Sequence, residues 1–137
     1  MKYNFIIISD DPIYVGVTKR VINKLYPDSQ TKSFDAHAGA LDYIRQNNNP
    51  DTVTCVFIDI WLNNVVKYVD FIAEFEKIPE QDRNSFYLYV LSPSTIKKDM
   101  IEAQSKKLVE FYLIKPFTKE TLGLIIQVLN KRLGLTQ

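Results

Sequence analysis

Polar residues follow several short apolar runs that are typical of buried strands. The residues in question are Asp10, Asp11, Asp59, Ser92 and Lys115. In an open parallel α/β sheet the carboxyl ends of the strands meet at one edge, and ligand sites lie there. We therefore expect these side chains, although they are far apart in the sequence, to form one site.

Three carboxylates at one sheet edge would repel one another and raise each other's pKa. A bound cation removes that repulsion, and Mg²⁺ prefers hard oxygen ligands while keeping several of its waters. Of the three, Asp59 points most clearly to a functional site, because its neighbours are apolar and a buried carboxylate costs free energy unless it is paired. For Asp10 and Asp11 the alternative is that they only cap a helix that begins at Pro12.

Lys115 is the natural partner of Asp59, because it follows an apolar run directly. Its ammonium is able to pair with the carboxylate, or with an oxygen that the carboxylate carries. Ser92 is able to donate a hydroxyl hydrogen bond to the same oxygen. The alternatives are an ordinary surface lysine and, for Ser92, a turn residue before Pro93.

Composition limits the class of protein. The chain has 137 residues and a formal net charge of +1, which fits one domain and argues against nucleic acid as the main partner. The single cysteine, Cys55, lies in an apolar run and is expected to be a buried core thiol, and the single histidine, His37, is expected at the surface. The apolar run near the N-terminus is too short for a signal peptide or a membrane span, so a cytoplasmic location is expected.

Short apolar runs alternate regularly with amphipathic stretches. Strands are expected at residues 5–8, 31–34, 53–60, 86–91 and 111–114, and helices from Pro12 to about residue 25, at 39–45, at about 65–77, at about 94–107 and from the N-cap Thr118 onward. This alternation favours a parallel sheet with helices on both faces, in one domain over residues 1–137 with no output domain.

The sequence resembles the receiver domain of two-component response regulators. The motifs that carry the resemblance are Ile-Ser-Asp-Asp at 8–11, Phe-Ile-Asp-Ile at 57–60, Val-Leu-Ser at 90–92 and Tyr-Leu-Ile-Lys-Pro-Phe at 112–117. The resemblance implies an α/β, flavodoxin-like, doubly wound (βα)5 fold. It also implies a five-stranded parallel sheet in the order 2-1-3-4-5.

The resemblance implies that Asp59 accepts a phosphoryl group from a sensor histidine kinase or a histidine phosphotransfer protein. The implied cofactor is Mg²⁺, with Asp11 and Asp59 as direct ligands and Asp10 as a ligand directly or through water. The backbone carbonyl of Trp61 is the further implied ligand. A domain of this kind is a regulatory phosphoacceptor rather than an enzyme.

Other residues receive roles from the same resemblance. Ser92 and Lys115 would contact phosphoryl oxygens, Tyr112 matches the aromatic residue of the switch, and the bond before Pro116 is a candidate cis peptide. The changed surface of helix 4, strand 5 and helix 5 would regulate a downstream effector protein. Direct contact with nucleic acid or membrane is not expected, and homodimerisation through that surface stays open.

The sequence departs from the family pattern in several places. The segment after Asp59 lacks the usual proline and glycine, so the loop shape and the helix start there are expected to differ. Trp61 is placed to cover the site, Pro93 would stiffen the loop after the switch serine, and Leu108 replaces a glycine. These departures favour the alternative of a phosphate-independent, receiver-like interaction module. An FMN-binding domain is disfavoured, since acidic residues occupy the loop that should offer bare N–H groups to phosphate.

Overall fold

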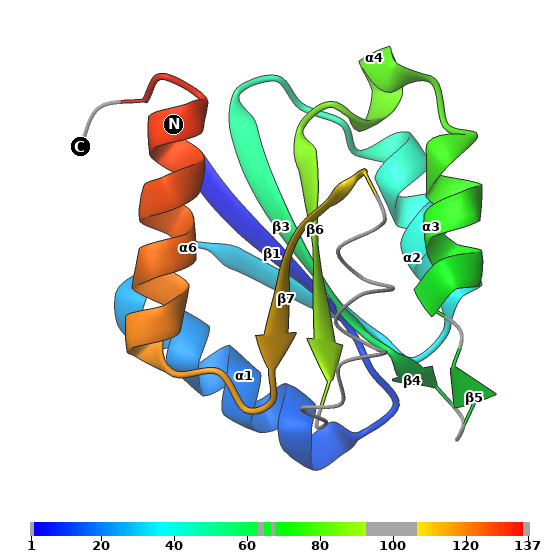
Figure 1. Ribbon diagram of the computed structural model, residues 1–137. Coiled ribbons are helices and arrows are strands. Elements are labelled where there is room, and N and C mark those ends of the chain that lie inside the picture. Colours follow the sequence, from blue (N-terminus) through cyan, green and yellow to red (C-terminus); the bar gives the residue numbers. More distant parts are fainter. Residues whose placement is uncertain (1, 63–64, 67, 93–106, 136–137) are drawn as a thin grey trace.

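The computed structural model describes residues 2–62, 65–66, 68–92 and 107–135 (Figure 1). Its strands are β1 (Lys2–Ile8), β2 (Gln30–Phe34), β3 (Thr52–Asp59), β4 (Trp61–Leu62), β5 (Val65–Val66), β6 (Phe86–Ser92) and β7 (Val109–Ile114). Its helices are α1 (Pro12–Leu25), α2 (His37–Gln46), α3 (Tyr68–Glu76), α4 (Glu80–Arg83) and α6 (Lys119–Arg132). The helix expected at about 94–107 lies outside the described residues.

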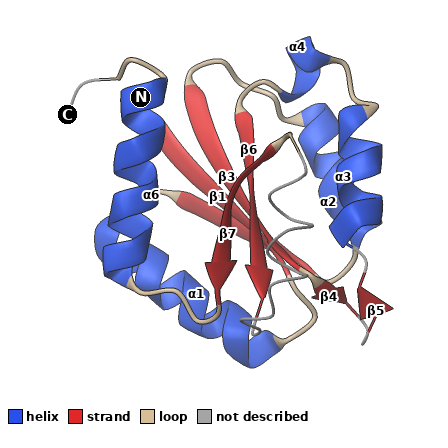
Figure 2. Ribbon diagram, in the orientation of Figure 1, coloured by secondary structure: helices blue, strands red, loops and turns tan. Residues whose placement is uncertain are grey.

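The main sheet has five strands in the order β2-β1-β3-β6-β7, and every neighbouring pair is parallel. Because β6 and β7 are the fourth and fifth strands of this sheet, the predicted order 2-1-3-4-5 is confirmed. Helices α1 and α6 cover one face, and α2 and α3 cover the other (Figures 1 and 2). The doubly wound architecture follows from the alternation of strands and helices.

Two hydrophobic clusters, one on each face of the sheet, form the core. Along β1, Ile6 and Ile8 pack with the cluster of α2 and α3, whereas Phe5 and Ile7 pack with the cluster of α1 and α6. Side chains of a strand alternate between the faces, so a strand covered on both sides must be apolar throughout. This is why the central strands could be recognised as unbroken apolar runs.

Cys55 belongs to the cluster beneath α1 and α6 and has no exposed surface. Burial raises the pKa of its thiol to about 12, so the nucleophilic thiolate is almost absent at neutral pH. The prediction of a buried core thiol is confirmed. His37, which was expected at the surface, is half-buried. The centroid of its ring lies 5.4 Å from that of the Phe71 ring.

The segment after Asp59 differs most from the sequence-based prediction. The helix predicted from about residue 65 begins only at Tyr68, and Val65–Val66 form β5, which pairs antiparallel with β4. β-Branched valines favour extended backbone over helix, which accounts for the later helix start. The short α4, after Pro79, was also not predicted.

The longest described helices are α1 and α6, with 14 residues each. Both bury one side against the sheet and expose the other to solvent, which is the pattern of amphipathic surface helices. Within the described part of the chain, no helix combines the length and apolarity that crossing a membrane requires.

Candidate functional site

Strand register brings the predicted site residues to one edge of the sheet. Ile8 on β1 pairs with Ile58 on β3, and Asp59 pairs with Leu91 on β6. Ser92, the last residue of β6, pairs with Ile114 of β7. Ser9, Asp59, Ser92 and Lys115 therefore occupy neighbouring strand ends, although up to 106 positions separate them in the sequence.

Asp59 is 2% exposed, and both of its carboxylate oxygens are engaged. Lys115 Nζ lies 2.7 Å from Oδ2, and the Ser9 hydroxyl donates to the same oxygen over 3.2 Å. The backbone N–H of Trp61 donates to Oδ1 over 3.1 Å. A charged partner and two further donors offset the desolvation that this carboxylate suffers on burial, so the expected pairing of Asp59 with Lys115 is confirmed.

Tyr14, on the first turn of α1, places the face of its ring against the ammonium of Lys115. Lys115 Nζ lies 4.7 Å from the centroid of the buried Tyr14 ring, a distance at which a cation is attracted to an aromatic face. Burial, reinforced by the negative charge of Asp59, raises the pKa of the Tyr14 hydroxyl above its ordinary value. The hydroxyl therefore stays protonated at physiological pH, and the ring faces the lysine as a neutral aromatic surface.

Asp11 is the N-cap of α1. Its Oδ1 accepts hydrogen bonds from the backbone N–H groups of Ile13 and Tyr14 over 3.0 and 3.2 Å. Its own backbone N–H donates to the Ser9 hydroxyl over 3.2 Å, so a chain of two hydrogen bonds links Asp11 to Asp59. The helix-capping alternative thus describes part of what Asp11 does.

Asp10 is exposed and lines a hollow of about 640 Å³ beside α1 and the end of β2. Across the described ranges, no group of three or more acidic, histidine or cysteine side chains is arranged to hold a metal ion. The structure therefore brings Asp59 together with Lys115, but it does not gather Asp10, Asp11 and Asp59 into one three-carboxylate cluster.

The remaining predicted residues lie around this pair. Ser92 is fully buried at the end of β6, and the hydrogen bonds described for Asp59 do not include it. Tyr112 is half-buried and packs against the cluster of α2 and α3. The bond between Lys115 and Pro116 is cis, which confirms that expectation.

Sequence reasoning gave no site role to Ser9 or Tyr14. Ser9 belongs to the motif at 8–11, and its position directly after a buried strand, as for Ser92, was the available signal. Tyr14 lies near the start of the helix expected from Pro12, and its spacing there does not distinguish it from a core residue. Its placement beside Lys115 depends on how α1 crosses the sheet, which a periodic pattern does not specify.

Comparison of the sequence with family models and with curated proteins gives no match. Solved structures do match the fold. A response regulator receiver protein from Dyadobacter fermentans superposes with a TM-score of 0.82 at 20% identity, covering 98% of this chain and 99% of that one. A two-component response regulator from Cytophaga hutchinsonii gives 0.78 at 21% identity, covering 95% and 99%.

A third match is the receiver domain of a sensor histidine kinase from Pseudomonas aeruginosa, described with a magnesium ion coordinated in its active site cleft. Its TM-score is 0.72 at 16% identity, over 93% of this chain and 97% of that one. At these identities the matches establish the fold. The chain has the flavodoxin-like fold of response regulator receiver domains, as predicted.

Proposed function

We propose that the protein is a phosphoacceptor switch of a two-component phosphorelay, which takes a phosphoryl group on Asp59 from a sensor histidine kinase or a histidine phosphotransfer protein. The observation that carries this proposal is the buried ion pair of Asp59 and Lys115, 2.7 Å apart at the carboxyl ends of the strands. Ligand sites of open α/β sheets lie at that edge. The receiver-domain fold of the matched structures supports the same assignment.

In the proposed reaction a carboxylate oxygen of Asp59 attacks the phosphorus of a phosphohistidine. The phosphorus–nitrogen bond breaks, its electron pair stays on the imidazole nitrogen, and Asp59 becomes an acyl phosphate. Charge in such a transition state is spread over the equatorial oxygens, so catalysis depends on positioning and electrostatics. Lys115 and the Ser9 hydroxyl, which already donate to Oδ2 of Asp59, are placed to donate to a phosphoryl oxygen instead.

Asp11 and Asp59 both contact the Ser9 hydroxyl, Asp11 through its backbone N–H and Asp59 through its carboxylate. Two neighbouring carboxylates suit Mg²⁺, because this ion is usually held by one or two carboxylates and keeps several waters. Asp59 and Asp11 would supply carboxylate oxygens, Asp10 would act directly or through water, and Trp61 would supply its backbone carbonyl. When bound, Mg²⁺ neutralises charge on the transferring phosphoryl group. The magnesium described in the Pseudomonas receiver domain supports this part of the proposal.

The phosphorylated state would be sensed by an effector protein through β7 and α6. In this proposal Ser92 turns toward the phosphoryl group and Tyr112 fills the space that is released. Large apolar side chains are exposed on both elements, including Ile114 on β7 and Leu124 and Val128 on α6. Exposed apolar groups of this kind suit a protein partner, or a second copy of the chain, better than water.

Intact-mass measurement after incubation with acetyl phosphate, with and without Mg²⁺, tests the proposal. We expect a single phosphoryl adduct that forms only with Mg²⁺. A phosphorylated histidine phosphotransfer protein serves as a second donor. Failure of both donors, together with no measurable Mg²⁺ binding, would instead support a phosphate-independent interaction module.

Tyr14 provides a test of how Lys115 is held. Tyr14→Leu removes the aromatic face beneath the ammonium, and a desolvated cation–π contact is worth up to about 2 kcal/mol. We expect phosphoryl uptake from acetyl phosphate to slow about tenfold, whereas Tyr14→Phe, which keeps the ring, should stay within about twofold of the unmodified protein. Equal rates for the folded Leu and Phe variants would show that the ring does not position Lys115.

Trp61 is 43% exposed, two residues after the proposed acceptor, with its backbone N–H fixed on Asp59. A large apolar side chain at this position should restrict the approach of water to an acyl phosphate. We expect Trp61→Asn to shorten the lifetime of phosphorylated protein at least threefold, measured by loss of the adduct mass over time after the donor is removed. An unchanged lifetime would exclude this shielding role.

A further inference from the structure

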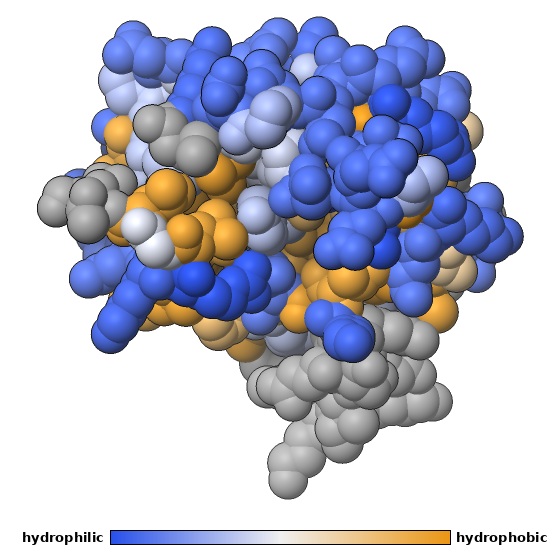
Figure 3. All heavy atoms as spheres, turned by 90° about the horizontal axis from the view of Figure 1, so that it is seen from above, coloured by the Kyte–Doolittle hydropathy of each residue, from blue (hydrophilic) through white to orange (hydrophobic). Residues whose placement is uncertain are grey.

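The amino end of the sheet carries a second polar region, at the opposite edge from Asp59. On the face that α2 and α3 cover, Ile6, Val56 and Leu88 form an apolar row on β1, β3 and β6, and Lys32 of β2 pairs with Ile6. On β2, β1 and β3 the preceding positions are polar, because Lys2 pairs with Thr52 and Asn4 lies between Gln30 and Thr54. The buried Phe86 of β6 pairs with Thr54 and adds an apolar side chain. Figure 3, which looks down on this end of the molecule, shows mostly hydrophilic side chains.

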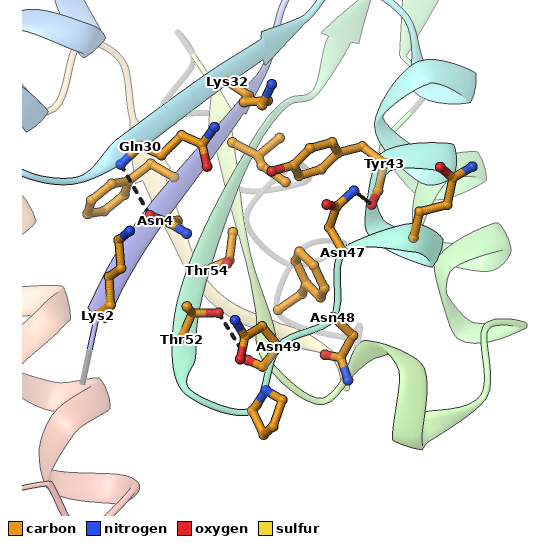
Figure 4. Close-up of a pocket in the computed structure, with 15 residues that line it drawn as sticks. Lys2, Asn4, Gln30, Lys32, Tyr43, Asn47, Asn48, Asn49, Thr52 and Thr54 are labelled. Carbon is orange, nitrogen blue, oxygen red and sulfur yellow. Dashed lines mark hydrogen bonds between the residues drawn. The ribbon is translucent and has the colours of Figure 1, made fainter.

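These rows and the loop after α2 line an open pocket of about 460 Å³. Strand residues such as Asn4 and Gln30 form one side, and Tyr43, Asn47 and Asn48 form the helix side (Figure 4). The volume lies within the range of about 300–1,000 Å³ that is usual for small-molecule sites. A polar hollow therefore replaces the core where α2 stops covering the sheet.

Two asparagine side chains in the pocket wall accept backbone hydrogen bonds through their amide oxygens. Asn4 Oδ1 accepts from the backbone N–H of Gln30 over 3.1 Å, and Asn49 Oδ1 accepts from that of Asp51 over 2.9 Å. Since the two amide oxygens are committed, the orientation of each amide is set. Among the described residues, no hydrogen bond engages the side-chain NH₂ of Asn4 or Asn49, so both remain as donors for a ligand.

The charged side chains among the described lining residues of the pocket are all positive. Lys2 and Lys32 line it, and none of the described lining residues is acidic. Within the part of the chain that the structure describes, neither lysine forms an ion pair, and Lys32 Nζ lies 5.4 Å from the centroid of the Tyr43 ring. Two ammonium groups and two oriented amide donors match an anion that carries two charges and several acceptor oxygens.

We propose that this pocket binds a small organic molecule that carries a phosphate group, independently of phosphoryl transfer at Asp59. The lysines and the amides of Asn4 and Asn49 would hold the phosphate, and the remaining volume would hold the organic part. The site differs from the proposed acceptor in chemistry, because it offers donors without a nucleophile and lies at the other end of the strands.

The test uses ¹⁵N-labelled Asp59→Asn protein without Mg²⁺, so that no phosphoryl transfer interferes. Glucose 6-phosphate and AMP are titrated separately, with glucose, adenosine and inorganic phosphate as comparison compounds, and the side-chain amide signals of Asn4 and Asn49 are followed. We expect saturable shifts of these signals with at least one of the two phosphate esters. Glucose or adenosine, the counterpart without the phosphate, should not shift these signals. Inorganic phosphate should bind more weakly than the phosphate ester.

A pair of charge-matched variants locates the binding. Lys2→Gln combined with Lys32→Gln should weaken the affinity at least tenfold, whereas Lys24→Gln combined with Lys77→Gln, at exposed lysines outside the pocket, should leave it unchanged. Absence of saturable shifts with both esters, or equal weakening in both double variants, would overturn the proposal. Binding of inorganic phosphate as tightly as the ester would overturn the organic part of it. Either result is independent of whether Asp59 accepts a phosphoryl group.

Discussion

Asp59→Asn is expected to abolish the phosphoryl adduct completely. Asparagine has nearly the same shape as aspartate, but it lacks the charged oxygen that attacks phosphorus, so the fold should persist while the chemistry is lost. The measurement is intact mass after incubation with acetyl phosphate and Mg²⁺. Asp59 is 2% exposed, and an asparagine of nearly the same shape should keep the packing around this position.

The matched control is Asp35→Asn, an exposed carboxylate that lines the hollow beside Asp10. This variant should form the adduct as the unmodified protein does. A full adduct in Asp59→Asn would place the acceptor elsewhere, and loss of the adduct in both variants would indicate a general effect of removing negative charge near the site. Only loss confined to Asp59→Asn agrees with the proposed acceptor.

The strands and the meeting of Asp59 with Lys115 could be predicted from local signals, because strands buried on two faces are apolar throughout and a charged residue at their end must lie at the sheet edge. The order of the strands came from the resemblance to receiver domains, since local patterns do not specify it. Asp59 also needed a cation nearby, since its neighbours are apolar. Lys115 was the lysine that directly followed a predicted strand, so the pairing could be inferred from two positions 56 residues apart.

Other parts of the site could not be predicted, because they depend on how elements pack rather than on local pattern. Tyr14 has the same sequence signature as any core residue of an amphipathic helix, and its contact with Lys115 arises from the path of α1 over the sheet. The β4–β5 pair after Asp59 is equally hidden, since Val65 fits both a helical stripe and a strand. The N-cap role of Asp11 could be predicted as one alternative, because it depends only on the adjacent backbone.

Lys115→Gln is expected to slow phosphoryl uptake about a hundredfold, since removing one pre-positioned donor from a charged transition state costs roughly 10²–10³ in rate. The measurement is the rate of adduct formation from acetyl phosphate in saturating Mg²⁺. Lys119→Gln, at an exposed lysine on the first turn of α6, is the control and should leave the rate unchanged. A rate for Lys115→Gln within threefold of the unmodified protein would remove Lys115 from the proposed mechanism.

The same substitution should also lower the free energy of unfolding, and by more than Asp59→Asn does. Lys115→Gln leaves the Asp59 carboxylate, whose side chain is 3% exposed, without its charged partner, which costs about 3 kcal/mol for a buried pair. In Asp59→Asn the Lys115 side chain is 15% exposed, so the ammonium is able to turn toward water and the cost should be about 1 kcal/mol. Urea unfolding of the two single variants and of the double variant measures this asymmetry. If the double variant is as stable as Asp59→Asn alone, the destabilisation in Lys115→Gln comes from the unpaired carboxylate; if the two single effects add, the side chains do not act as a pair.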